Sequence, residues 1–191
     1  MDSTSPPNTR ATVGLQLTGP LAAELAQAFD SLFAMADRPH QLLTRWRRSQ
    51  LRRAVACPDG ELLLSAPGRG RNAFKRALLQ DLATAQRIGI VAAYFIPTVR
   101  LRMALTRAAR RGARVQIILP ARSDVQLALL ASRNFYARLM RAGIEMYEYQ
   151  PQILHSKLVV LETAAYVGSS NLDARSLHIN YELMVKLTVP E

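Results

Sequence analysis

The chain has 191 residues, and 49% of them are hydrophobic, which is enough for one core of ordinary size and excludes an intrinsically disordered protein. Lys and Arg total 25 against 14 Asp and Glu, so the formal net charge is +11 and partners that carry phosphate groups are favoured. The single cysteine, Cys57, excludes an internal disulfide framework and a metal site built from several cysteines.

The sequence contains no signal for membrane insertion or secretion. No continuous apolar run approaches the roughly 18 residues that cross a bilayer. The opening residues, M-D-S-T-S-P-P-N-T-R, lack the order of a secretory signal. We therefore expect a cytoplasmic protein whose membrane contact is peripheral.

The first 59 residues predict three segments. Residues 1–10 are polar and contain two prolines, which indicates a disordered tail. Residues 11–37 predict a strand at Thr12–Leu17 and then a helix that begins at Pro20. Four apolar residues at helical spacing share one face of that helix: Leu21, Leu25, Phe29 and Leu32.

Residues 38–59 predict an arginine-rich linker. Five arginines lie between Arg45 and Arg53, around Trp46. Such a cluster suits an anionic lipid surface or a nucleic acid. It suits a solvated connector equally well.

From residue 60 onward, strands and helices alternate. The expected strands are residues 62–65, 89–95, 115–119, 144–149 and 181–189. The expected helices are residues 72–87, a helix that opens at Pro97 and ends before Gly112, and residues 125–142 with Asp124 as the N-cap. Strands separated by helices predict an α/β fold with a mixed, largely parallel sheet flanked by helices on both faces.

The stretch from Ile153 to Asn171 concentrates the chemistry. His155 and Lys157 stand two residues apart at the start of an apolar run, so on a strand they project from the same face. A second strand would bring the small polar turn Gly168–Asn171 back to them. Alone, such a histidine is more often structural.

Together, these groups predict a phosphate site. A neutral imidazole can attack phosphorus, and an ammonium with Ser and Asn donors can hold phosphoryl oxygens. This set of groups calls for no metal and no cofactor.

The order His155-Ser156-Lys157, four residues, Glu162, and then Gly168-Ser169-Ser170-Asn171 resembles the signature of the phospholipase D superfamily. That signature is His-x-Lys, four residues, Asp, and later Gly-Ser-x-Asn. Further stretches resemble the cardiolipin synthases, particularly the kind without transmembrane anchors, and the resemblance spans roughly residues 11 to 189. These stretches are Ala93-Tyr94-Phe95-Ile96-Pro97, residues 108–113, residues 139–144, Asn171-Leu172-Asp173-Ala174-Arg175-Ser176 and Asn180-Tyr181-Glu182.

The resemblance implies a role for each site residue. His155 would become a phosphohistidine, while Lys157 and Asn171 hold the non-bridging oxygens. Glu182 would accept a hydrogen bond from the nucleophilic imidazole. Three residues would support the phosphate site: Ser169, Ser170 and Glu162, the last standing where the family has Asp.

Family members use two such motifs, one histidine as nucleophile and the other as general acid and then base. This chain has one, since neither His40 nor His178 is followed two residues later by Lys. Residues 11–37 resemble a strand-helix remnant of a first phospholipase D-like repeat, and residues 60–191 resemble the second repeat. The chain therefore resembles the C-terminal half of such a synthase.

The resemblance implies a cardiolipin synthase-like phosphatidyltransferase that acts on phosphatidylglycerol-type phospholipids. It would work on the inner face of the cell membrane, bound peripherally, with a second motif from a homodimer partner. Two alternatives stay open. One is a catalytically silent fragment that binds anionic membrane surfaces, and the other, ranked last, is a homodimeric phosphodiesterase that acts on nucleic acid.

Overall fold

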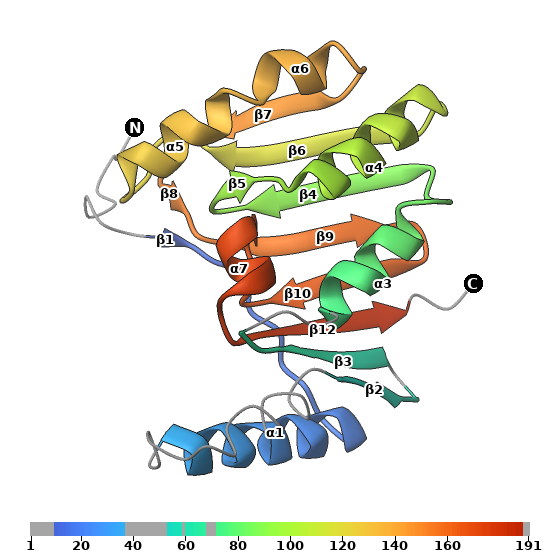
Figure 1. Cartoon of the computed structure of the whole chain (residues 1–191), viewed down its shortest axis with the longest axis vertical. Coiled ribbons are helices and arrows are strands. Elements are labelled where there is room, and N and C mark those ends of the chain that lie inside the picture. Colours follow the sequence, from blue (N-terminus) through green and yellow to red (C-terminus); the bar gives the residue numbers. More distant parts are fainter. Residues whose placement is uncertain (1–9, 37–52, 59, 68–71, 189–191) are drawn as a thin grey trace, which may run out of the picture.

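The computed structural model describes residues 10–36, 53–58, 60–67 and 72–188 (Figure 1). Its centre is an eight-stranded sheet in the order β2-β3-β12-β10-β9-β4-β6-β7. In that order the strands are Ala54–Cys57, Gly60–Ser65, Glu182–Thr188, Ala164–Gly168, Lys157–Leu161, Arg87–Ala92, Arg114–Pro120 and Glu145–Tyr149.

The sheet is mixed and mostly antiparallel, so the expectation of a largely parallel sheet is wrong. Only the pairs β4–β6 and β6–β7 are parallel, and the other neighbours are antiparallel. The strands linked by helices, β3, β4, β6 and β7, do run in one direction. However, β12, β10 and β9 insert between β3 and β4, and this insertion creates every antiparallel contact of the sheet except β2–β3.

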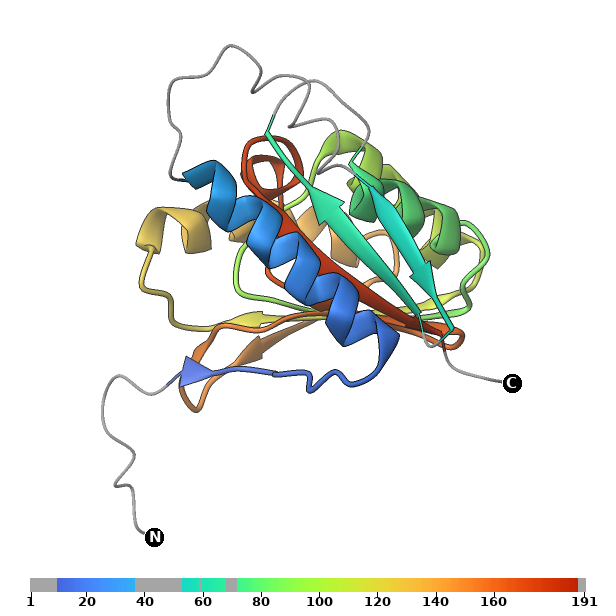
Figure 2. The ribbon, with the colours of Figure 1, turned by 90° about the horizontal axis from the view of Figure 1, so that it is seen from below.

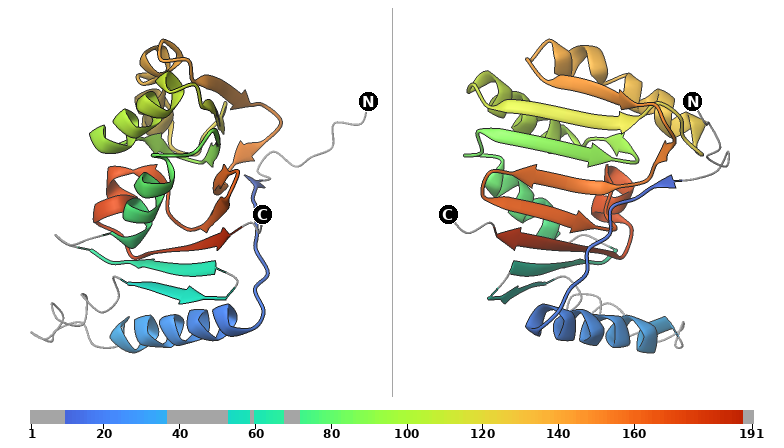
Figure 3. Two further views of the ribbon diagram at one scale, coloured as in Figure 1. Left: turned by 90° about the vertical axis from the view of Figure 1, so that its right-hand side faces the viewer. Right: turned by 180° about the vertical axis from the view of Figure 1, so that it is seen from behind.

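Helices cover the two faces of the sheet unequally. Five described helices lie on one face: α3 (Ala73–Asp81), α4 (Val99–Arg110), α5 (Gln126–Arg133), α6 (Tyr136–Met140) and α7 (Ala174–His178) (Figures 1 and 3). On the opposite face, α1 (Pro20–Ala36) lies against the β2–β3 end, as Figure 2 shows from below. None of the described helices is long and apolar enough to cross a bilayer.

Successive side chains of a strand point to opposite faces of the sheet, so the core forms two clusters, one on each face. The larger cluster lies under the five helices and contains Phe74, Leu105, Ile117 and Tyr166. The smaller one joins Leu21 and Ala28 of α1 to inward-facing residues of β3 and β12. On α1, Leu21 is buried as expected but Phe29 is 63% exposed, because Ala28 takes the inward position.

Several expected boundaries differ from the structure. The expected strand at residues 12–17 does not form, and the first strand is β1 (Arg10–Ala11). The helix expected over residues 72–87 ends at Asp81, and the helix expected over residues 125–142 is divided into α5 and α6. Asp124 is not a cap, since Val125 holds the N-cap position of α5 without a side-chain hydrogen bond.

Other local signals are confirmed. The side chain of Asn72 accepts a hydrogen bond from the backbone N–H of Lys75 and caps α3, and Thr98 caps α4 in the same way. Gly112 follows α4 with a φ of 94°, a left-handed conformation that favours glycine.

Parts of two expected segments lie outside the described residues. Nearly all of the expected tail does, since Arg10 alone is described. The linker is described only over residues 53–58, which contain β2, so most of the Arg45–Arg53 cluster is also outside.

Two short parallel pairs complete the fold at one end of the sheet. β1 pairs with β8 (Ile153–Leu154), and β5 (Phe95–Ile96) pairs with β11 (Leu172–Asp173). The right-hand view of Figure 3 shows β1 beside β8, next to the end where β4 and β6 finish and β9 begins. These pairs bring four distant segments of the chain to one place.

At the opposite end of β9, Glu162 ties the β9–β10 hairpin to the start of β4. Its carboxylate accepts hydrogen bonds from the backbone N–H groups of Gln86 at 2.7 Å and Arg87 at 3.0 Å. Partial burial tends to raise the pKa of Glu162, but these hydrogen bonds outweigh it and hold the pKa below its ordinary value. Although longer than Asp by one methylene, Glu162 fixes the hairpin at the end of β9 opposite to His155, so a direct role in the phosphate site stays a prediction.

Replacing Glu162 by Ala should therefore lower the stability of the fold by about 1.5–3 kcal/mol, the range for hydrogen bonds to a charged group. Because the folded pKa is depressed, this contribution is present above the unfolded value of about 4.3 and is lost as the pH falls through the folded pKa. Thermal unfolding followed by circular dichroism at neutral and acid pH measures both effects. Asp30→Ala, which removes an exposed carboxylate on α1, is the matched control, and equal melting temperatures for Glu162→Ala and Asp30→Ala would contradict the prediction.

Candidate functional site

His155 lies in the link between β8 and β9, and its backbone is fixed on both sides. Its N–H donates to the carbonyl oxygen of Ala11 at 2.8 Å, which continues the β1–β8 pairing. The next residue, Ser156, is buried; its hydroxyl donates to Ala11 at 3.2 Å, and its carbonyl accepts from the N–H of Ala93 at 3.0 Å. The imidazole is therefore carried on a backbone with little freedom to move.

Lys157 opens β9 and pairs with Ala92, the last residue of β4. Burial lowers the pKa of Lys157, and Arg10 adds to this effect, whereas nearby carboxylates oppose it. Glu182 is the strongest of these carboxylates. The lysine is half-buried at the same end of the sheet as His155. Because His155 lies in the link before β9, the expectation that both side chains project from one face of a strand stays a prediction.

The turn after β10 depends on Gly168. A Cβ atom there would lie 2.1 Å from the carbonyl oxygen of Leu183, so only glycine lets β10 approach β12 this closely. After this contact the chain turns through Ser169 and Ser170 to Asn171, whose buried Oδ1 has no hydrogen-bond partner among the described residues. An unsatisfied buried amide oxygen is costly, and as an acceptor it would bond a donor group of a ligand and not a phosphoryl oxygen.

The two serines of the turn act within the protein. The hydroxyl of Ser169 donates to Glu182 at 2.5 Å and accepts from the backbone N–H of Leu183 at 3.0 Å. Ser170 is buried, and its hydroxyl donates to the carbonyl oxygen of Asn171 at 3.3 Å. Both serines therefore hold Asn171 and Glu182 in place.

Glu182 is hydrogen-bonded to Ser169 and Asn180 instead of His155. Its second oxygen accepts from the side chain of Asn180 at 3.0 Å. Within the described parts of the chain, the imidazole of His155 has no hydrogen-bond partner; its contact is the edge of the Tyr94 ring, with the centroids 6.2 Å apart. The structure thus places Glu182 near Lys157, and the bond between Glu182 and His155 stays a prediction.

Three residues that no sequence pattern links to the site lie beside His155: Tyr94, Asp124 and Arg10. Tyr94 donates its hydroxyl hydrogen to Asp124 at 2.6 Å, and the guanidinium of Arg10 pairs with the other oxygen of Asp124 at 3.2 Å. Tyr94 belongs to the Ala93–Pro97 stretch noted in the sequence, but Asp124 had the pattern of a helix cap. Arg10 lies 114 residues from Asp124, so no local pattern could indicate the contact.

The surroundings favour a neutral imidazole. Burial lowers the pKa of His155, the charges of Lys157 and Arg10 lower it further, and Asp124 opposes them. Burial and the bond to Asp124 raise the pKa of Tyr94 to about 12, so its hydroxyl stays a donor. The arrangement combines a neutral nitrogen nucleophile with two nearby cations, which suits attack on a phosphate ester.

Comparison with known proteins points to one family. The family described as "Cardiolipin synthase, PLD-like domain" matches residues 78–191. Cardiolipin synthase B of Shigella flexneri is 33% identical over 186 residues, which cover 94% of this chain and 44% of that protein. Cardiolipin synthase A of Pseudomonas fluorescens Pf-5 is 33% identical over 181 residues, 93% of this chain and 36% of that protein.

Solved structures share the fold. The phospholipase D family member Nuc from Salmonella typhimurium superposes with a TM-score of 0.52 at 21% identity, covering 66% of this chain and 83% of Nuc. Phosphatidylserine synthase from Haemophilus influenzae superposes with a TM-score of 0.58 at 16% identity, covering 77% of this chain and 40% of the synthase. At these identities, the likeness shows the α/β phospholipase D-like fold alone.

This chain spans less than half the length of the two synthases, 44% and 36%. The family match nevertheless covers more than half of the chain, and the synthases align with nearly all of it. The chain therefore belongs to the cardiolipin synthase family of phospholipase D-like proteins.

Proposed function

We propose that this chain carries one half of the active site of a phosphatidyltransferase that makes cardiolipin from phosphatidylglycerol-type lipids. The observation that carries the proposal is the imidazole of His155, whose pKa is lowered by burial and by Lys157, at the end of the sheet where Lys157 and the turn Gly168–Asn171 also lie. The identity of 33% to cardiolipin synthases supports the choice of lipid substrate. The reaction proposed here uses no metal or other cofactor.

In the proposed reaction, a ring nitrogen of His155 attacks the phosphorus of one phosphatidylglycerol. The bond from phosphorus to the glycerol headgroup breaks, and the departing alkoxide takes a proton from a second histidine. A hydroxyl of a second phosphatidylglycerol then attacks the phosphohistidine and returns its proton to that second histidine. The products are cardiolipin and glycerol, and His155 is free again.

The second histidine must come from another motif. We propose that a second copy of the chain supplies it across a two-fold axis, because one His-x-Lys motif is present here. Another polypeptide could supply it equally well. The mass of the protein in solution distinguishes a homodimer from a complex with another polypeptide. A mass equal to that of one chain would contradict the homodimer.

The nucleophile is tested with phosphatidylglycerol vesicles and chromatographic separation of the lipids. His155→Ala should lower cardiolipin formation by at least about 1,000-fold, because the covalent intermediate can no longer form. Gln27→Ala, an exposed change on α1, is the control and should retain full activity. If the wild type forms no more cardiolipin or phosphatidic acid than His155→Ala does, the proposed transfer is wrong.

Arg10 provides a test through pH. It lowers the pKa of His155, and without it the remaining Asp124 charge raises that pKa. In Arg10→Ala, the acid limb of the activity profile should therefore move to higher pH, since only the neutral imidazole attacks phosphorus. Arg87→Ala removes the same charge at the distant end of β4, and its profile should match the wild type. An unchanged acid limb in Arg10→Ala would show that Arg10 has no influence on the nucleophile.

We also propose that the helical face binds anionic lipid headgroups at the inner face of the membrane. A groove of about 620 Å³ between α4 and α6 supports this proposal, because its lining is basic and apolar apart from Thr106 and contains no carboxylate. Its basic residues are Arg102, Arg107, Arg110, Arg138 and Arg141, and its large apolar residues, Val99 and Met103, are 59% and 46% exposed. Guanidinium groups bind phosphates, and exposed apolar side chains enter the headgroup boundary. This surface would serve a catalytically silent membrane binder as well as an enzyme.

The combined change of Arg107, Arg110 and Arg138 to Ala should weaken binding to phosphatidylglycerol vesicles by about 100-fold at low salt, at about 1 kcal/mol for each residue. Vesicle sedimentation at several ionic strengths measures it. Changing Arg87, Arg114 and Arg133 to Ala removes the same net charge outside the groove and should weaken binding far less. Equal losses in the two triple variants, or binding that salt does not weaken, would contradict a specific surface.

Nucleic acid is the alternative substrate, and the net charge of +11 supports it. Release of DNA fragments without added metal, abolished in Lys157→Ala, would favour this activity. Complete inactivity on DNA would remove it.

A further inference from the structure

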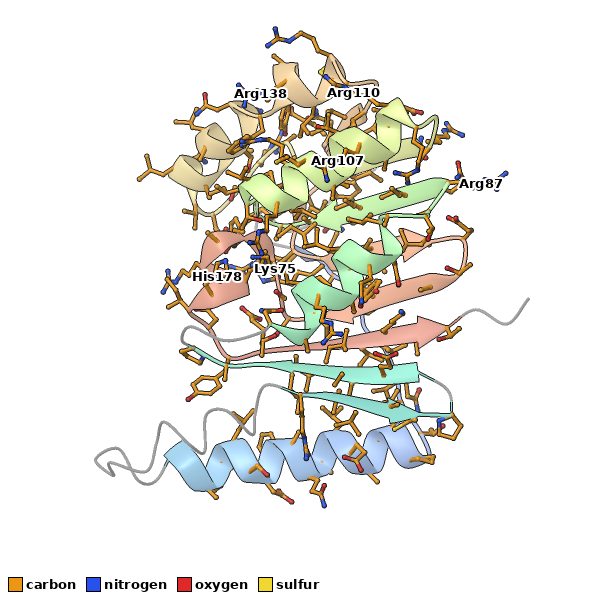
Figure 4. All side chains as sticks on the ribbon, turned by 45° about the vertical axis from the view of Figure 1, so that its right-hand side comes forward. Lys75, Arg87, Arg107, Arg110, Arg138 and His178 are labelled. Carbon is orange, nitrogen blue, oxygen red and sulfur yellow. The ribbon has the colours of Figure 1, made fainter. Side chains whose placement is uncertain are left out.

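A second cavity lies on the helical face, away from His155. It has a volume of about 710 Å³ and is bounded by α3, the start of α4 and the end of α7. Its lining residues are Asn72, Lys75, Arg76, Leu79, Gln80, Ala83, Arg100 and His178. Figure 4 shows Lys75 and His178 next to each other there, and Arg107, Arg110 and Arg138 higher on α4 and α6. No residue of this cavity belongs to the candidate active site.

The cavity gathers four basic side chains without a carboxylate. The Nζ atom of Lys75 lies 3.4 Å from Nε2 of His178. In the described parts of the chain, the side chains of Arg76 and Arg100 make no hydrogen bond or ion pair. Their charges are therefore balanced only by solvent or by a ligand.

These like charges also affect one another. Burial lowers the pKa of Lys75, and the charge of Arg100 lowers it further. Burial lowers the pKa of His178, and Lys75 adds to this effect. Arg175, on the same short helix as His178, and Arg76, on α3, are also cationic. A bound anion would relieve this repulsion and would raise both pKa values.

The position of the cavity is fixed by hydrogen bonds. The side-chain amide of Asn72 donates to the carbonyl oxygen of Leu177 at 3.0 Å and thereby joins the start of α3 to the end of α7. At its other end, α7 is capped by Asp173, which accepts from the N–H of Ser176 at 2.7 Å. The Lys75–His178 distance is thus set by two helices that are joined to each other.

We propose that this cavity is a second binding site, specific for a phosphate group on a molecule with a short apolar part. The phosphoryl oxygens would be contacted by the lysine, the arginines and protonated His178. Each arginine can donate two hydrogen bonds to one phosphate group. Leu79 and Ala83 would contact the apolar part. The phosphate could come from a soluble phosphate ester or from a lipid headgroup.

This inference does not depend on the proposed phosphatidyl transfer, because it concerns binding at residues that take no part in that reaction. His155→Ala should retain the site in full. Loss of the transferase activity and loss of this site are therefore separate results.

The test is an NMR titration of the C2–H proton of His178 against pH, with the resonance assigned from His178→Gln. Inorganic phosphate, glycerol 3-phosphate and dihexanoyl phosphatidic acid are added separately. In the occupied site, the pKa of His178 should rise by about one unit, the size of shift that a nearby opposite charge produces. Lys75→Gln and Arg100→Gln should abolish the rise without unfolding the protein, and Arg87→Gln, which removes an equal charge at the start of β4, should leave it unchanged.

The three ligands distinguish the sources of the phosphate. A rise with glycerol 3-phosphate and phosphatidic acid alike supports a soluble ester as a sufficient ligand, whereas a rise with phosphatidic acid alone supports a lipid headgroup. A rise that persists in both Lys75→Gln and Arg100→Gln would overturn the site, because the anion would then be acting from elsewhere. No rise with any of the three ligands would overturn it too.

Discussion

The antiparallel pairing of β9 with β4 is the contact on which the rest of the structure depends. It joins Ile88 to Leu161 at one end and Ala92 to Lys157 at the other. Glu162 fixes the first end through the N–H groups of Gln86 and Arg87. The bond from Ala93 to Ser156 extends the second end to the residue beside His155. A displacement of β9 along β4 would therefore move the proposed nucleophile and the hairpin together.

The site depends equally on its electrostatics. Desolvation disfavours charge on both His155 and Lys157, and each positive neighbour lowers the pKa of the imidazole further. Arg10 also lowers the pKa of His155. Because Arg10 pairs with Asp124, it limits the rise in that pKa that the carboxylate would otherwise cause. The cations that would hold a phosphate thus also keep the nucleophile in its neutral form, so binding and reactivity have one physical origin.

Features set by neighbours in the sequence were predictable. Thr98 lies at the start of α4 and Gly112 directly after its end, where the sequence predicts the helix to begin and to stop. Features set by distant partners were not predictable. The order of the sheet depends on three strands that insert between two helix-linked ones, and nothing in the spacing of the helices records that insertion.

Asp124 shows the same limit at a single residue. Its position before an apolar helical run has the pattern of an N-cap, yet a tyrosine 30 residues away and an arginine 114 residues away take its two oxygens. Two partners for a carboxylate outweigh one backbone N–H, so tertiary contacts override the local preference. The sequence alone predicts Arg10 to be the end of a polar tail, because the partners of Arg10 become its neighbours only when β1 pairs with β8.

The distribution of the arginines follows from the way the core is built. In α4, Leu101, Leu105 and Ala108 are buried at helical spacing, so its four arginines are left to project from the outer surface. The helix has no acidic residue, and its arginines line both cavities: Arg100 lines one, and Arg102, Arg107 and Arg110 line the other. By contrast, two arginines beside β7, Arg114 and Arg133, pair with Glu145 and Glu148 of that strand. The periodicity that buries α4 therefore also concentrates unpaired positive charge on the helical face, where an anionic partner can neutralise it.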